Sequence, residues 1–288
     1  MIQALSGQLL VGLINGSFYA LLSLGLAIIF GLLDVVNFAH GAQYMLGAFV
    51  AWMAMQYLGI NYWWALILTP LAVGALGVGF ERVLLRRLYG LDSLYGLLLT
   101  FGVALVLEGA FQNAFGISGN SYPVPEQLQG GTNLGFMYLP RYRVWVVLVS
   151  VAVCFANWLV IERTRLGAYL RAGTENPALL QAFGVNVPLM RGLTYGYGVG
   201  LAAFAGVMAA PIYQVTPLMG SGVIMVLFAV VVIGGMGSIA GSIVTGLGLG
   251  LIEGLTKFLY PPASDVVVFV VMALVLLLRP AGLFGRQR

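Results

Sequence analysis

A few polar and ionisable residues interrupt the long apolar stretches of this sequence, and they are the groups best placed to do chemistry. Asp34, Asn37 and His40 recur at three-residue spacing, which would align them on one face at a helix end. Glu108 stands in a second apolar stretch and shares a helical face with Gln112. An ionisable group at bilayer depth costs about 2.5–3.5 kcal/mol, so such groups tend to face a protein interior or a water-filled path.

Each of these groups also has a structural interpretation. The Asp34–His40 motif would equally serve as a helix cap or as a cluster of hydrogen-bonded polar groups at the membrane interface. Glu108 fits a buried hydrogen-bond partner as well as a group that lines a path. Glu253 precedes Lys257 by four residues, the favourable order for a helical pair, and this spacing predicts a structural ion pair.

The chemistry of catalysis is scarce in this chain. It has one histidine and one cysteine, whereas a metal site or a catalytic triad needs several titratable groups brought together. Lys257 is the sole lysine, and its neighbours do not form the Gly-x-x-x-x-Gly-Lys-Ser/Thr loop that binds nucleotide phosphates. The sequence therefore predicts neither an enzyme nor a bound cofactor. An ATP-driven process would need an ATPase on another subunit.

The composition indicates an integral membrane protein. Of the 288 residues, 61% are hydrophobic and 8% are charged, whereas soluble domains carry about 25% charged residues. The net charge of +4 is thinly spread, which argues against nucleic-acid binding. We expect one transmembrane domain over residues 1–288, with no room for a separate soluble domain.

Apolar runs predict an all-α, polytopic membrane helix bundle with eight to ten transmembrane or re-entrant helices. The weakest predictions are the second span and the boundary between two spans near residues 237 to 241. One of these could be a half-helix, which a membrane tolerates when protein or a water-filled cavity provides hydrogen-bond partners for its free backbone groups. The nine candidate spans are 8–30, 41–59, 62–80, 93–115, 143–161, 192–210, 222–240, 241–259 and 264–278.

Basic residues predict the orientation, because short cytoplasmic loops retain Lys and Arg. With nine spans, ten of the 13 basic residues fall on one side. The C-terminus is then cytoplasmic and the N-terminus lies outside; with eight or ten spans the N-terminus would move inside. The ten residues are Arg82, Arg86, Arg87, Arg163, Arg165, Arg171, Arg191, Arg279, Arg286 and Arg288.

Glycine is abundant, with 40 residues gathered partly in short runs. In lipid, small residues let helix backbones approach closely, so these runs favour packing seams. The run Gly234, Gly235 and Gly237 also suits an unwound or mobile helix beside a translocation path. Together with Asp34, Asn37, His40 and Glu108, these three glycines are our candidates for the path or gate.

The polar loop from Glu162 to Arg191 carries the punctuation of a short helix. Asn176 can cap it, Pro177 suits its first position, and Gly184 supplies a left-handed stop. Apolar side chains exposed on such a helix would seek a partner groove, or would rest on lipid headgroups. The residues concerned are Ala178, Leu179, Leu180, Ala182 and Phe183.

Residues 116 to 142 form the one sizeable segment on the other side. They are rich in turn formers and show no helical period. The segment is either a solvated loop or the place where a substrate-delivering protein docks.

The N-terminal residues resemble the signature of the LivH-type permeases of branched-chain amino acid ABC transporters. The resemblance is carried by residues 15–26, which begin Asn-Gly-Ser-Phe-Tyr, and by Asp34-Val-Val-Asn37-Phe-Ala-His40-Gly41. The loop from Arg171 to Gly184 looks like that family's coupling segment, and Arg279–Gly285 looks like its usual ending. The Glu-Ala-Ala run of the general ABC-permease loop is not present as such.

The resemblance implies a permease subunit of a bacterial inner-membrane importer that works by alternating access. Its implied partners are a second homologous permease in a heterodimer, two cytoplasmic ABC ATPase subunits that bind ATP, and an extracytoplasmic amino-acid-binding protein. Close relatives carry urea or short amides, which leaves those substrates as an alternative. A self-sufficient secondary carrier, coupled to ions or protons through Asp34, Glu108 or Glu253, is the other alternative.

Overall fold

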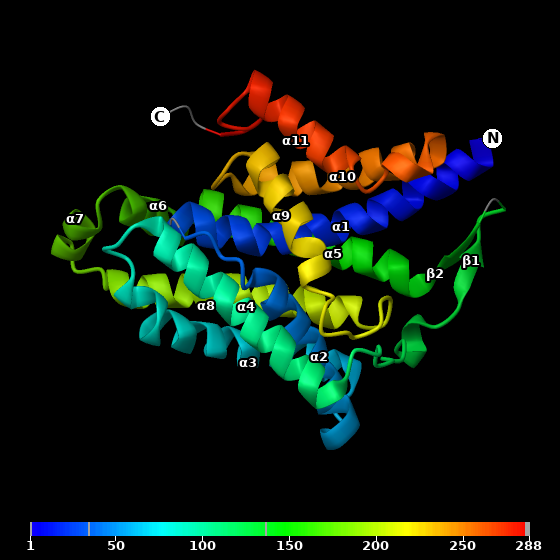
Figure 1. The fold of residues 1–288 in the computed structure, drawn as a ribbon, viewed down its shortest axis with the longest axis horizontal. Coiled ribbons are helices and arrows are strands. Elements are labelled where there is room, and N and C mark those ends of the chain that lie inside the picture. The colour runs from blue at the N-terminus through cyan, green and yellow to red at the C-terminus, as the bar shows by residue number, and fades with distance from the viewer. Residues whose placement is uncertain (1, 34, 136, 286–288) are drawn as a thin grey trace. The chain divides into compact units, whose positions relative to one another are not determined.

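The computed structural model describes residues 2–33, 35–135 and 137–285. Asp34, Arg286 and Arg288 lie outside the described residues. The chain is almost entirely helical (Figure 1). Its helices are α1 (Ile2–Leu33), α2 (His40–Leu58), α3 (Tyr62–Val83), α4 (Ser93–Phe115), α5 (Arg141–Arg163), α6 (Arg165–Glu175), α7 (Pro177–Ala182), α8 (Val187–Ala209), α9 (Ser221–Gly234), α10 (Ile239–Leu259) and α11 (Val267–Leu278).

Every predicted span overlaps a helix, so the prediction of an all-helical bundle is confirmed, although the span 222–240 runs past the end of α9 at Gly234. In the described part of the chain, six helices are long and apolar enough to cross a membrane, namely α1, α3, α4, α5, α8 and α10. The helix α2 is less apolar, and α9 and α11 have only 14 and 12 residues. The protein is therefore a multi-pass membrane protein, but the predicted count of eight to ten spans is not established.

The predicted weak point near residues 237 to 241 is a real helix break. The helix α9 ends at Gly234, and α10 begins at Ile239 behind the Ser238 side chain, which accepts a hydrogen bond from the Gly241 amide at 3.1 Å. Gly235 and Gly237 have φ values of 98° and 86°. Because this left-handed region suits glycine, the two residues allow the chain to turn sharply between the helices.

The extramembrane segment 116 to 142 departs from the all-α prediction. Strand β1 (Gly131–Asn133) pairs antiparallel with β2 (Tyr138–Pro140), and Thr132 lies opposite Leu139. The strands have three residues each, too few to show a period in the sequence. The hairpin was therefore missed, although the turn formers around it were recognised.

The chain divides into two compact units. The first comprises 1–24, 123–156 and 225–288, and the second comprises 25–122 and 157–224. The prediction of one transmembrane domain over 1–288 stays a prediction.

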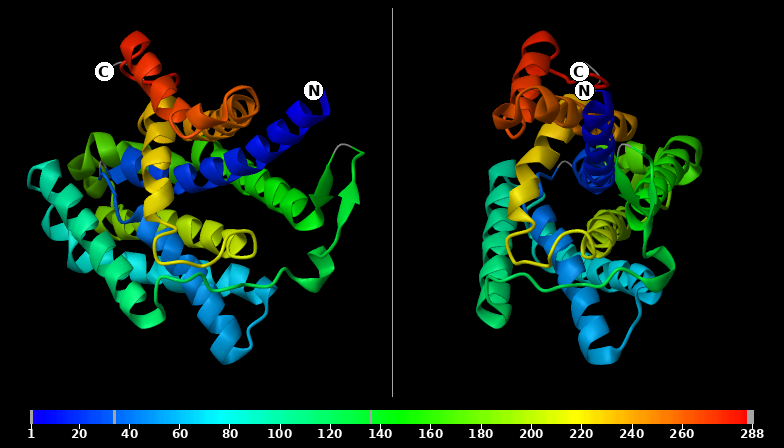
Figure 2. Two further views of the ribbon diagram at one scale, coloured as in Figure 1. Left: turned by 45° about the vertical axis from the view of Figure 1, so that its right-hand side comes forward. Right: turned by 90° about the vertical axis from the view of Figure 1, so that its right-hand side faces the viewer.

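The first unit is built on close contact between helix backbones. The N-terminal half of α1 runs beside α10, as Figure 2 shows in blue and orange. A Cβ atom added to Gly16 would lie 2.9 Å from the carbonyl oxygen of Leu247, and one added to Gly254 would lie 3.1 Å from the Cα atom of Gly12. In the predicted run, Gly246 and Gly250 lie against the α1 backbone, which confirms a seam there, whereas nothing lies within 4 Å of a Cβ atom added to Gly248.

In the second unit, α8 packs along both α2 and α3. Gly47 on α2 lies directly against the backbone of Ala203 on α8, so no side chain would fit between the two helices. Tyr195 and Phe49 are fully buried in this unit. The unit therefore holds the segment between α1 and α2 against a closely packed helical core.

Candidate functional site

Residues 35–39, which precede α2, are not helical, and α4 holds them in place. The Thr100 hydroxyl on α4 accepts a hydrogen bond from the Phe38 amide at 3.1 Å and lies 3.2 Å from the Val36 carbonyl oxygen. Thr100 itself is fully buried. Because backbone groups inside a membrane protein must find partners, this threonine stabilises a non-helical stretch.

A buried chain of polar side chains starts from this segment. The Asn37 amide donates to Gln43 at 3.0 Å, and the Gln43 amide donates to the Tyr195 hydroxyl on α8 at 3.0 Å. His40 is also fully buried, and a Cβ atom added to Gly25 would lie 3.1 Å from its ring. The backbone amide of His40 donates to the Asn37 carbonyl oxygen at 3.3 Å. Both predicted residues, Asn37 and His40, are therefore buried in one segment, and Gln43 and Tyr195 extend the side-chain hydrogen bonds from Asn37.

The short helix predicted in the polar loop is present as α7. The Asn176 side chain accepts a hydrogen bond from the Leu179 amide at 2.9 Å, Pro177 is the first helical residue, and Gly184 has a φ of 83°. Leu179 and Phe183 are 54% and 78% exposed, and Ala178 is exposed too. The predicted cap, stop and apolar surface are confirmed at these positions.

Leu180 corrects the prediction of an apolar side chain exposed on this helix. It is buried, because it faces Gly173 of α6, where a Cβ atom would lie 3.4 Å from a Leu180 methyl group. The exposed apolar surface of α7 therefore consists of Ala178, Leu179, Ala182 and Phe183.

The helix α6 precedes α7 and was not predicted. Arg171 fastens it to the end of α5 by donating to the Ile161 carbonyl oxygen at 2.9 Å and by pairing with Glu162 at 3.6 Å. Gly167 allows this turn, because a side chain there would collide with the Ile161 backbone. Its amphipathic pattern, with Gly167, Leu170 and Gly173 buried, was the available signal in the sequence.

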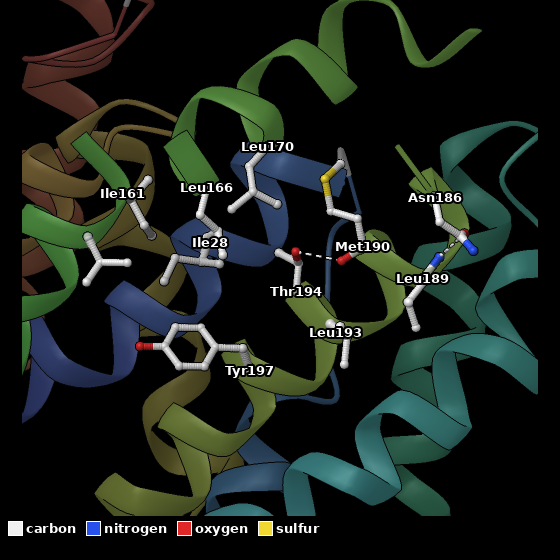
Figure 3. A pocket seen from close by; sticks show the side chains of 11 residues that line it. Ile28, Ile161, Leu166, Leu170, Asn186, Leu189, Met190, Leu193, Thr194 and Tyr197 are labelled. Carbon is white, nitrogen blue, oxygen red and sulfur yellow. Dashed lines mark hydrogen bonds between the residues drawn. The ribbon is translucent and has the colours of Figure 1, made fainter. Parts of the chain in front are cut away.

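An apolar cavity of about 610 Å³ is lined by residues of α1, α5, α6 and α8 (Figure 3). Its walls include Ile28 of α1, Leu166 and Leu170 of α6, and Met190 and Leu193 of α8. The polar side chains in the wall already have local partners: the Thr194 hydroxyl donates to the Met190 carbonyl oxygen at 2.8 Å, and Tyr197 donates to Asn157. The cavity offers apolar packing surface and little chemistry.

The comparisons with known proteins decide the family. The model of the family described as "Branched-chain amino acid transport system / permease component" matches residues 8–276. This chain belongs to that family.

Individual relatives match along nearly their whole length. The chain is 33% identical to the high-affinity branched-chain amino acid transport system permease protein BraD of Pseudomonas aeruginosa, over 97% of this chain and 95% of the relative. It is 31% identical to LivH of Escherichia coli K12 over the same shares, and 25% identical to a probable LivH of Methanocaldococcus jannaschii. No solved structure matches the chain.

The glycine run at the end of α9 has a packing role in this permease. Gly234 lies against Gly241, and Gly235 lies against Gly285 of the C-terminal segment. The Leu283 and Phe284 amides donate to the carbonyl oxygens of Ile233 and Gly234 at 2.8 and 3.1 Å. The C-terminal segment Arg279–Gly285 thus donates hydrogen bonds to carbonyl oxygens at the end of α9, where the helix stops and leaves them without helical partners. Whether Gly234, Gly235 and Gly237 also border a path stays a prediction.

Glu108 of the permease is half-buried on α4 and lies within hydrogen-bonding reach of the Ser221 side chain at the start of α9. Both residues belong to the second unit, as do Asn37 and His40, whereas the glycine run belongs to the first. The two interpretations of Glu108, a hydrogen-bond partner or a path-lining group, both remain compatible with this contact.

Sequence reasoning missed a buried carboxylate at Glu81. It is fully buried near the end of α3 and accepts a hydrogen bond from the Tyr89 hydroxyl at 2.9 Å. Burial, and next the Glu81 carboxylate, raise the pKa of Tyr89, and Arg191 stacks over the Tyr89 ring at 5.2 Å. The spacing of Val73, Gly77 and Glu81, which lie on one buried face of α3, was the missed signal.

The predicted ion pair between Glu253 and Lys257 is wrong. The ion pair found within the described residues is a different one, between Arg171 and Glu162, and the Lys257 side chain is exposed. Glu253 accepts hydrogen bonds from Tyr19 at 2.8 Å and from Asn15 at 3.4 Å instead. Tertiary contact between α1 and α10 therefore outweighs the local i, i+4 rule at this position.

Gly192 on α8 makes the burial of Glu81 possible, and this yields a prediction. A Cβ atom at Gly192 would lie 2.9 Å from Oε2 of Glu81, so Gly192→Ala should displace the carboxylate. We expect a loss of about 1–3 kcal/mol of stability, measured by thermal unfolding in detergent. The control is Gly102→Ala, because nothing lies within 4 Å of that position. An equal melting temperature for both variants would contradict the assigned contact.

Proposed function

We propose that this chain is the permease subunit of an ATP-driven importer that moves branched-chain amino acids across the bacterial inner membrane by alternating access. The observation that carries the proposal is the family match over residues 8–276, which spans nearly the whole helical bundle. The chain itself has no catalytic role in this proposal, and ATP is bound and hydrolysed on partner subunits.

The α7 surface supports a coupling role. Ala178, Leu179 and Phe183 present apolar side chains on a short, capped helix outside the long apolar helices. Exposed apolar groups on such a helix suit the groove of a protein partner. We assign Asn176, Pro177, Ala178, Leu179, Leu180, Phe183 and Gly184 to the contact with the ATPase, with Leu180 acting as the anchor that fixes α7 on α6.

The remaining partners and the topology complete the proposal. A second, homologous permease forms a heterodimer with this chain, two ABC ATPases bind on the cytoplasmic side, and an amino-acid-binding protein docks at residues 116 to 142. The shorter helices α2, α9 and α11 add to the six long spans to give eight to ten transmembrane or re-entrant helices, with a cytoplasmic C-terminus. The candidate gate comprises Asp34, Asn37, His40 and Glu108, with Gly234, Gly235 and Gly237.

Copurification tests the proposed assembly. The tagged chain is extracted in mild detergent without crosslinker, and the accompanying chains are identified by mass spectrometry. We expect a second permease and two copies of ABC ATPase subunits. A chain that purifies alone and transports in reconstituted vesicles without ATP would contradict the proposal and favour a secondary carrier.

A further inference from the structure

The apolar cavity of Figure 3 lies at one end of two helices that are long and apolar enough to cross a membrane. Val160 and Ile161 belong to the last turn of α5, and Met190 belongs to the first turn of α8. The cavity extends to Tyr197, ten residues after α8 begins at Val187, which is about 15 Å along the helix at 1.5 Å per residue. This length is half of the hydrocarbon core of a bilayer, which is about 30 Å thick. The cavity therefore has the depth of one leaflet.

The cavity opens onto the surface of α8. Leu189, Leu193 and Tyr197 line it and recur every four residues on one face of that helix. Their side chains are 42–55% exposed, whereas Ile161 and Leu170, which also line the cavity, are buried. A molecule in the surrounding membrane can therefore enter the cavity from the side, without passing through the helical bundle.

The walls of the cavity suit an apolar ligand. The Asn186 side chain caps α8, and the Thr194 and Tyr197 hydroxyl groups donate to Met190 and Asn157. The remaining lining residues are apolar. The volume of about 610 Å³ falls within the range of about 300–1,000 Å³ that small-molecule sites occupy. An amino acid would leave its two charged groups without charged partners here, which is costly in an apolar medium.

Two arginines stand at the end of the cavity where α5 gives way to α6. Arg163 is the last residue of α5 and Arg165 the first residue of α6, and both are exposed. Arg163 lies over the Trp158 ring at 5.9 Å, and tryptophan is typical of the boundary between membrane and water. Arg165 directly precedes Leu166, which lines the cavity. In the described part of the chain neither arginine forms an ion pair.

The helix α6 has the pattern of a helix that lies in the membrane interface. Leu170 is buried, whereas Leu166 and Tyr169 are exposed apolar or aromatic side chains beside the basic Arg165. Helices of this kind rest with their apolar side chains at the boundary between headgroups and acyl chains. The cavity wall that α6 contributes therefore lies at the depth of lipid headgroups.

We propose that this cavity binds an acyl chain of an anionic phospholipid, whose phosphate is held by Arg163 and Arg165. The guanidinium group binds phosphate oxygens through two parallel hydrogen bonds, and basic pockets between membrane helices are typical sites for anionic headgroups. Residues 160 to 171 contain three arginines and one glutamate, so their charge selects an anionic lipid over a zwitterionic one. The bound lipid fastens α6 to the ends of α5 and α8.

Photolabelling locates the site. The protein is purified in detergent with the chains that accompany it, and is irradiated with phosphatidylglycerol that carries a diazirine in one acyl chain. We expect the label in peptides that cover residues 160–170 and 186–197. Unlabelled phosphatidylglycerol should compete at a concentration about fivefold or more below that of phosphatidylcholine with the same acyl chains. A label that is confined to other helices, or equal competition by the two lipids, would overturn the site.

Charge variants test the headgroup contact. Arg163→Gln combined with Arg165→Gln should weaken phosphatidylglycerol binding about fivefold or more, measured by titration in native mass spectrometry. The matched control is Arg86→Gln combined with Arg87→Gln, because these two arginines are also exposed and adjacent to a helix end. Equal affinity in the two double variants would contradict the assignment of the headgroup.

A size variant tests the acyl-chain contact and the identity of the occupant. Leu193→Trp should narrow the cavity and lower the photolabel about fivefold or more, whereas Leu98→Trp at an exposed position of α4 should leave it unchanged. An undiminished label in Leu193→Trp would overturn the acyl-chain site. A label present in the isolated chain and absent from the assembled complex would show that a partner subunit covers the cavity, and would also overturn the proposal.

Discussion

Replacement of Gly184 by valine is expected to uncouple ATP hydrolysis from uptake while membrane insertion stays normal. Gly184 has a φ of 83°, and a β-branched residue is strongly disfavoured in this region. The space around it is open, so the penalty is conformational rather than steric contact with a neighbour. The strain is about 1–3 kcal/mol, enough to tilt α7 away from the geometry that Asn176 and Gly184 fix.

The coupling prediction is measured as leucine taken up per ATP hydrolysed in proteoliposomes. We expect a drop of about fivefold or more in Gly184→Val, the factor that corresponds to roughly 1 kcal/mol. Gly184→Asn should retain coupling, because asparagine tolerates the left-handed conformation. Gly90→Val provides the control, since Gly90 is exposed, lies in a loop and has ordinary backbone angles. Normal coupling in Gly184→Val would refute the assignment of α7.

Replacement of Gln43 by leucine should disable transport more severely than any surface change of the same chemistry. Gln43 is the central member of the buried chain from Asn37 to Tyr195, with one hydrogen bond on each side at 3.0 Å. Its loss would leave the Asn37 amide and the Tyr195 hydroxyl buried without this partner. Each unsatisfied buried group costs about 1–3 kcal/mol.

The expected result for Gln43→Leu is a loss of uptake of about tenfold or more, together with a lower melting temperature, because about 1.4 kcal/mol corresponds to a factor of ten. Gln56→Leu is the matched control: it makes the same replacement on the same helix at an exposed position. Both variants are compared for ATP-dependent uptake and for thermal unfolding. If Gln43→Leu behaved like Gln56→Leu, the buried chain would have no part in positioning the segment between α1 and α2.

Local signals in the sequence predicted local structure well. The Asn176 cap, the Pro177 start and the Gly184 stop follow from preferences of single residues for particular backbone positions, and all three are present in α7. The helix break between α9 and α10 was expected near residues 237 to 241, whereas α9 already ends at Gly234. Such features depend on a few neighbouring residues and not on the packing of distant helices.

Features that depend on distant contacts were not predictable in this way. Leu180 is buried because α6 folds back beneath α7, and Glu253 is paired with Tyr19, which lies 234 residues away in the sequence. The burial of Glu81 requires Gly192 on a different helix. Helical periodicity describes contacts within one helix only. It therefore predicted an ion pair between Glu253 and the nearby Lys257 on the same helix.

The most direct test of the proposed function is substrate uptake by the reconstituted complex of this chain with its second permease, its ATPases and its binding protein. Radiolabelled leucine, urea and acetamide are supplied outside proteoliposomes that contain ATP, a non-hydrolysable ATP analogue, or no nucleotide. We predict leucine accumulation with ATP alone, unaffected by collapse of ion and proton gradients. Accumulation of urea or acetamide in place of leucine, or uptake that needs a gradient and no ATP, would contradict the account.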